Sequence, residues 1–188
     1  VMDYKVFDEL LDRQAVADFR ARALSPENPQ TKGTAQNDDI YFQMREAQNS
    51  YYNALPDIVA DYMKKISEVT GRNYAPFVYY GDPDASDIIV AMGSVCECAK
   101  EVIDHLRAKG EKVGILCVHL YRPFSEKYFF EALPKSVKRI AVLDRTKEPG
   151  SVGEPLYTDV CALFANKQNT PKIIGGRYGL SSKDVNPD

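Results

Sequence analysis

The chain has 188 residues, of which 44% are hydrophobic, and its formal net charge is −3 with a pI near 5.5. This length and apolar fraction suit one domain, or slightly more, with a sizeable core. The acidic balance argues against nucleic acid or an anionic membrane as the main partner, because both bind basic surfaces, and no apolar run approaches the ~18 residues of a membrane span.

The first 75 residues show little regular patterning. A row of apolar residues from position 7 predicts a helix that ends near Leu24, and a polar stretch follows over residues 33–39. A second helix is expected to start at Pro56 and to end at Gly71, since proline suits a first helical turn and glycine a helix end. Long loops usually carry function or contact another structure. We therefore expect residues 1–53 to be the tail of a preceding domain and a linker.

Strands and helices alternate regularly in the rest of the chain. Short apolar runs predict strands at 88–92, 113–120, 140–143 and 172–174, with an aromatic edge strand at 77–80. Helices are expected after Ser94, Ser125 and Gly153; Ser94 and Glu97 fit a capping box, and the first helix shows an apolar stripe formed by Val95, Cys98, Val102 and Leu106. This order predicts an α/β fold for residues 54–188, a three-layer sandwich with a mostly parallel sheet.

Function in such a sheet concentrates at the carboxyl ends of the strands. Four loops qualify, and their candidate interdomain or anion-binding residues are Gly93, Ser94, Arg122, Arg145, Lys147, Gly150, Ser151, Gly153 and Arg177. Arg122 could offer a planar fork to a carboxylate or phosphate, or it could pair with an acidic neighbour at a domain contact.

The loop from Asp144 to Gly153 leaves three interpretations open. It has neither a Walker A pattern nor a G-x-G-x-x-G fingerprint. Its glycines precede a helix and lie close to Lys147 and Arg145, which would suit a small anion. Glu148 and neighbouring acids partly cancel that charge, so a structural turn or an interdomain clamp is the alternative.

Catalytic and metal-binding patterns do not emerge from the cysteines and histidines. No C-x-x-C pair occurs, and the four cysteines fall largely in apolar patterns, which predicts reduced, packed thiols and no metal site. His119 is expected inside an apolar strand as a packed residue, and neither histidine adjoins a nucleophile. No catalytic residue is predicted. The absence of a signal peptide at the start predicts a cytoplasmic protein, and a first residue other than Met suggests a piece of a longer one.

Several stretches of the chain resemble one known family in the same order along the sequence. They are Ala23–Pro26, Gly33–Asn37, Ala91–Ser94, Leu120–Ser125, Val142–Gly150 and Gly175–Ser182. Together they are similar to pyruvate:ferredoxin (flavodoxin) oxidoreductase, a large multidomain enzyme of anaerobic metabolism.

The resemblance implies a place inside a larger enzyme. Members oxidatively decarboxylate pyruvate to acetyl-coenzyme A on thiamine diphosphate and magnesium, and pass electrons through iron–sulfur clusters to ferredoxin or flavodoxin. This chain would be the end of the first domain and the second domain, which is similar to the C-terminal domain of transketolases. The resemblance implies no cofactor in this segment, contacts with other domains of the same polypeptide, and a homodimer for the whole enzyme.

Two functional alternatives remain beside an interdomain module without a complete active site. One is an anion-binding or coenzyme A-binding module that uses the Gly150 loop. The other is a free-standing flavodoxin-like carrier, which would need a Ser/Thr-rich phosphate loop after its first strand; the Met92–Cys96 stretch is not one.

Overall fold

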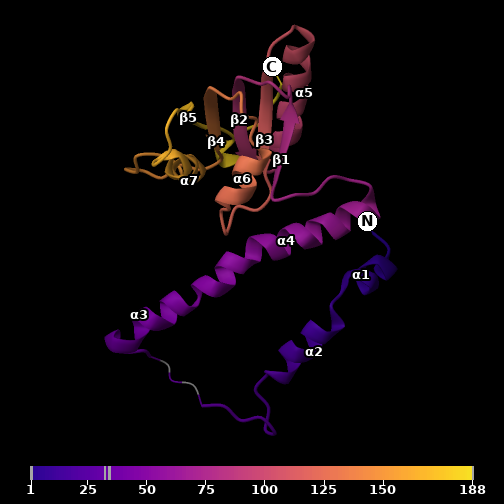
Figure 1. The fold of residues 1–188 in the computed structure, drawn as a ribbon, viewed down its shortest axis with the longest axis vertical. Helices are drawn as coiled ribbons and strands as arrows, with labels where there is room; N and C mark the ends of the chain where they lie inside the picture. The colour runs from indigo at the N-terminus through magenta and orange to yellow at the C-terminus, as the bar shows by residue number, and fades with distance from the viewer. Residues whose placement is uncertain (1, 32, 34, 188) are drawn as a thin grey trace.

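A computed structural model describes residues 2–31, 33 and 35–187. Thr34, within the family-like stretch Gly33–Asn37, lies outside the described residues. Figure 1 shows an α/β domain formed by the C-terminal part of the chain and a separate arm formed by the N-terminal helices.

The N-terminal arm contains more helix than the sequence predicted. It consists of α1 (Tyr4–Leu10), α2 (Arg13–Ala21), α3 (Asp38–Ala47) and α4 (Asn49–Thr70). The single helix expected up to Leu24 is two helices, because the Asp12 side chain accepts a hydrogen bond from the Ala15 N–H and caps a new helix. The polar stretch expected as a linker leads directly into α3.

The prediction that Pro56 starts a helix was wrong. Pro56 lies inside α4, seven residues after Asn49. Proline favours a first turn because its missing N–H is unpaired there, but a helix anchored by its neighbours can hold one in its interior. Gly71 ends the helix in the left-handed conformation, as expected. Helix α4 thus crosses the proposed boundary between residues 53 and 54, and that boundary stays a prediction.

The sheet has five strands in the order β1-β3-β2-β4-β5. They are β1 (Phe77–Gly81), β2 (Asp87–Met92), β3 (Val113–Val118), β4 (Arg139–Asp144) and β5 (Lys172–Arg177). Only β1, at one edge, runs antiparallel to its neighbour; the pairs β2–β3, β2–β4 and β4–β5 are parallel. The carboxyl ends of the four parallel strands therefore lie at one edge of the sheet.

Helices cover both faces of this sheet, which confirms the predicted three-layer α/β architecture (Figure 1). Helices α6 (Glu126–Ala132) and α7 (Pro155–Phe164) pack on one face around the fully buried Phe129. Helix α5 (Val95–Ala108) packs on the other face around Ile103 and Ile115. The helices lie on different faces because crossovers between parallel strands are right-handed. The connection from β2 to β3 runs toward the β1 edge of the sheet, whereas the connections from β3 to β4 and from β4 to β5 run toward the β5 edge.

Two details of α5 correct the sequence analysis. Its buried residues are Val95, Cys96, Ala99 and Ile103. Val95 belongs to the predicted stripe, but Ala99 and Ile103 are buried in place of their predicted neighbours Cys98 and Val102. The expected capping box is also absent, because Ser94 has helical dihedral angles and its side chain makes no capping hydrogen bond. A helical Ser94 points its hydroxyl away from the N–H groups that a cap would have to reach.

Candidate functional site

Asp144 closes the carboxyl end of β4 and holds the start of α7. Its side chain is only 3% exposed, and its carboxylate accepts hydrogen bonds from the N–H groups of Leu156 at 2.9 Å and Tyr157 at 3.1 Å. These N–H groups belong to the first turn of α7, where the helix dipole favours a negative charge. Asp144 therefore occupies the place that an external anion would need.

Glu154 is a second buried acid, immediately before α7. It is 5% exposed and accepts hydrogen bonds from the Glu148 N–H at 2.7 Å and from Nη1 of Arg177 at 2.7 Å. The ammonium group of Lys147 lies 3.8 Å from the same carboxylate. The hydrogen bond from the Glu148 backbone lowers the pKa of Glu154 most, and the nearby Arg177 and Lys147 lower it further.

The turn between these two acids directs its polar groups inward. The Ser151 N–H donates to the Glu148 carbonyl, the Gly153 N–H donates to Oγ of Ser151, and that hydroxyl donates to the Gly153 carbonyl. Gly150 has a φ of 83°, which favours glycine. At the tip, Val152 is 98% exposed. The N–H groups of Glu148, Ser151 and Gly153 are thus bound within the loop, and an apolar side chain projects from its tip.

Arg145 also binds a group of the same domain. Nε of Arg145 donates to the Gly179 carbonyl at 3.1 Å, which joins the loop after β4 to the segment after β5. Arg177, at the end of β5, is held by Glu154. The loop after β4 is thus joined through Arg145 to the segment after β5, and Lys147 and Arg177 both face Glu154.

Glycine is required where the ring of Tyr157 passes between two strand-end segments. A Cβ on Gly153 would collide with that ring, and a Cβ on Gly175 would lie 3.0 Å from it. The aromatic ring therefore fixes the distance between the start of α7 and the end of β5.

Gly93 and Ser94 lie at the neighbouring strand end, directly after β2. Ser94 and Arg145 both line a hollow of about 290 Å³, together with Tyr178 and the C-terminal segment. The hydroxyl of Tyr178 donates to the Met92 carbonyl at 3.2 Å and so joins the segment after β5 to the end of β2.

Arg122 stands apart from the cluster. Nη2 of Arg122 lies 2.8 Å from Oδ2 of Asp159 on α7, and its guanidinium carbon lies 3.9 Å from the centre of the Tyr121 ring. Burial and the nearby Asp159 raise the pKa of Tyr121. The pairing with an acidic neighbour that we considered is present, and that neighbour belongs to the same domain.

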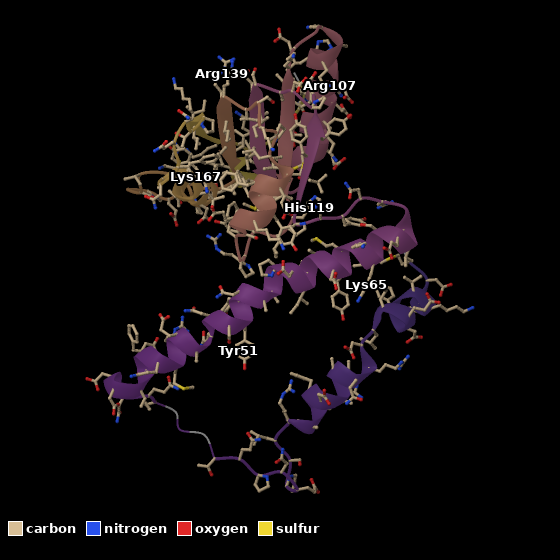
Figure 2. The ribbon with its side chains drawn as sticks, in the orientation of Figure 1. Tyr51, Lys65, Arg107, His119, Arg139 and Lys167 are labelled. Carbon is tan, nitrogen blue, oxygen red and sulfur yellow. The ribbon has the colours of Figure 1, made fainter. Side chains whose placement is uncertain are left out.

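The histidine and cysteine environments complete the inventory. His119 lies just past β3 and is exposed, not packed inside the strand as predicted, because the strand ends at Val118 and Nδ1 of His119 lies 3.0 Å from the Ala75 carbonyl oxygen. Figure 2 shows it on the side of the α/β domain that faces α4. Cys96, Cys98, Cys117 and Cys161 are free thiols. Among the described residues, no three His, Cys, Asp or Glu side chains gather as metal ligands.

Reasoning from sequence missed the two residues that organise the site. Asp144 and Glu154 were counted only as charges that weaken a basic loop. The position of Asp144 carried a signal, because an acid at the end of an apolar strand can bind N–H groups at the start of the following helix. Glu154 stands at the N-cap position of α7 but makes no capping hydrogen bond there, so nothing in the sequence indicated its partners Glu148 and Arg177.

Comparison with known proteins decides the family. The sequence model of "Pyruvate:ferredoxin oxidoreductase core domain II" matches residues 85–188. This chain belongs to the pyruvate:ferredoxin oxidoreductase family. The earlier resemblance is thereby confirmed, and the matched region contains all four strands of the parallel part of the sheet.

Curated relatives cover the chain from end to end. It is 61% identical over 187 residues to a pyruvate-flavodoxin oxidoreductase of Enterobacter agglomerans and 55% identical over 187 residues to a pyruvate:ferredoxin oxidoreductase of Moorella thermoacetica. Each alignment covers 100% of this chain and 16% of the relative. The chain thus spans about one sixth of the length of these pyruvate:ferredoxin oxidoreductase family members.

Solved structures show weaker similarity. A 2-oxoglutarate:ferredoxin oxidoreductase from Magnetococcus marinus matches 87% of the chain and 26% of its own with a TM-score of 0.48 and 16% identity. A split-gene transketolase matches 62% of the chain and 37% of its own with a TM-score of 0.46 and 13% identity. Similarity at this level does not refine the fold further. No helix among the described residues is long and apolar enough to cross a membrane.

Proposed function

We propose that this chain is an interdomain module of a longer enzyme that oxidatively decarboxylates pyruvate to acetyl-coenzyme A and passes the electrons to ferredoxin or flavodoxin. The names and the 16% coverage of the relatives support this proposal. Other domains of the same polypeptide are its partners, and the whole enzyme is a cytoplasmic homodimer. The four free thiols of this chain fit a reducing compartment.

The observation that carries the proposal is the internal pairing of the carboxyl edge. Lys147 and Arg177 face the buried carboxylate of Glu154, and the start of α7 is bound by Asp144. A catalytic site needs groups that are free to meet a substrate. Here Lys147 and Arg177 are paired with Glu154 although their side chains are partly exposed, and the apolar Val152 projects beside them. Such a surface suits a fixed contact with another domain.

The chemistry belongs elsewhere in the polypeptide on this account. Thiamine diphosphate, magnesium and iron–sulfur clusters would be held by other domains, as the family resemblance implies. The contribution of this domain is to position its neighbours.

The anion or coenzyme A alternative gains no observation in its favour. A bound phosphate at the Gly150 loop would have to replace Asp144 at the N–H groups of Leu156 and Tyr157, or replace Glu154 at Arg177. Both acids are buried and fixed, so an incoming anion would meet like charge.

Two measurements test the proposal. We expect the 188-residue chain, supplied with thiamine diphosphate and magnesium, to reduce no dye with pyruvate, and we expect an antibody against it to detect a native polypeptide about six times its 21.1 kDa, since it spans 16% of its relatives. Pyruvate-dependent reduction by the chain alone, or a native species of its own mass, would overturn the proposal.

A further inference from the structure

Helices α3 and α4 carry a continuous apolar row that faces solvent. Its members are Ile40, Met44, Tyr51, Leu55, Ile58, Tyr62 and Val69, all of them exposed. They follow each other at intervals of three, four or seven residues, which places them along one side of a helix. We call this row the α3–α4 stripe. It runs for about 40 Å at 1.5 Å per residue.

The opposite side and one flank of α4 are already attached to the α/β domain. Pro56 is the buried residue of this helix, and the carboxylate of Asp57 accepts hydrogen bonds from Nζ of Lys127 at 2.9 Å and from the hydroxyl of Tyr128 at 2.7 Å. Figure 2 shows Tyr51 and Lys65 on the side of α4 that points away from the α/β domain. The helix therefore has one attached side and one open apolar side.

The stripe is almost free of charge. Lys65 is the charged residue in its line, and its ammonium nitrogen lies 4.8 Å from the centre of the Tyr62 ring, so that the cation covers an aromatic face. Single exposed apolar residues are ordinary on protein surfaces, but a contiguous row of this length marks a surface that contacts protein. Its low charge fits a permanent apolar partner better than a transient, electrostatically guided one.

We infer that the α3–α4 stripe binds an apolar surface of another domain of the same polypeptide. The inference rests on the proposed function, and the length of the relatives supports it, because this chain spans only 16% of them. The stripe also lies before residue 85, where the match to the family's core domain II begins. It thus gives the module a second docking surface, distinct from the Val152 edge.

The helices α1 and α2 of the same chain do not provide that cover. Among the described residues, the hydrogen bonds and the ion pair of residues 2–31 stay within that segment. With 7 and 9 residues, these helices are also too short to cover the stripe. Figure 1 shows them apart from α4.

Cysteine reactivity tests the inference directly. The test variant is Ile58→Cys, which lies within the stripe. The control variant is Tyr52→Cys, which is exposed but lies about 100° round the helix from Tyr51. Each variant is labelled with a maleimide in the 188-residue chain and in the intact polypeptide, and the modified peptides are quantified by mass spectrometry. We expect Ile58→Cys to react at least about tenfold more slowly in the intact polypeptide, the change that 1.4 kcal/mol of closure gives. Tyr52→Cys should react at similar rates in both.

Other outcomes assign the stripe differently and overturn the inference. Equal rates for Ile58→Cys in both proteins would show that the stripe stays open. Slow labelling in the dilute 188-residue chain would show that α1 and α2 cover it, and slowing only as that chain is concentrated would identify a second copy as the occupant. Absence of any larger native polypeptide would instead refute the proposed function, and is detected separately by its mass.

Discussion

Glu154, at the start of α7, accepts a hydrogen bond of 2.7 Å from the guanidinium group of Arg177 at the end of β5. In a loop that looks like an anion site in sequence, this carboxylate and that of Asp144, which binds the first turn of α7, already occupy the donors. The stability of the domain should therefore respond to both acids.

Replacement of Asp144 by Ala should destabilise the 188-residue chain. The change leaves the N–H groups of Leu156 and Tyr157 without their acceptors in a buried position, at a cost of about 1–3 kcal/mol. Asp144→Asn keeps one acceptor oxygen and should cost less. Urea denaturation measures both, and equal stability of wild type and Asp144→Ala would refute the capping role.

Acid should weaken the domain through Glu154. Its pKa in the folded state is depressed, so the unfolded chain binds the proton more readily, and the stabilisation is fully present above the unfolded value of about 4.3. It is lost as the pH falls through the lower, folded value. Denaturation curves between these limits should show a steeper loss for the wild type than for Glu154→Gln, which cannot titrate. Parallel pH profiles for the two proteins would contradict this assignment.

Removal of the Phe129 ring should disrupt the larger core. Phe129 is 0% exposed and meets the rings of Phe77, Phe130 and Phe164 edge to face. Phe129→Ala should cost about 3–5 kcal/mol, whereas Phe19→Ala, in the exposed arm, should leave the unfolding of the α/β domain unchanged. Chemical denaturation followed by circular dichroism distinguishes the two.

The N-terminal arm should open far more readily than the sheet in the 188-residue chain. Helices α1, α2 and α3 contain no buried residue, whereas β2 and β4 lie in the centre of the sheet. Amide hydrogen exchange should therefore be fast over residues 2–31 and slow over 88–92 and 140–143. Similar protection in both regions would mean that the arm is folded independently.

The sequence allowed the α/β part to be predicted because each element there is specified locally. A short apolar run that ends at a glycine, such as Ile88–Met92, is typical of a buried strand, and Pro155 fits the first turn of α7 as expected. The N-terminal arm was harder to predict. Pro56 lies in the interior of α4, although proline by itself favours the first turn of a helix, and the local sequence does not show this exception.

The candidate site shows the other limit of sequence reasoning. The cluster of Arg145, Lys147 and Arg177 follows from their strand ends, but their partners do not. Whether Glu154 opposes the cations or points to solvent depends on packing between α7 and β5, which joins residues 23 positions apart in the sequence. The interpretation as an anion site failed to gain support for that reason.

The most direct test of the interdomain account is the turnover of the intact polypeptide with Val152→Asp, measured as pyruvate-dependent dye reduction beside Val152→Thr as the isosteric control. Because Val152 is 98% exposed, neither change should alter the melting of the 188-residue chain. In the intact enzyme, a charge placed in a desolvated contact costs about 2–5 kcal/mol, so Val152→Asp should lose most of its turnover while Val152→Thr keeps it. Normal turnover of Val152→Asp would show that this edge of the sheet touches no other domain.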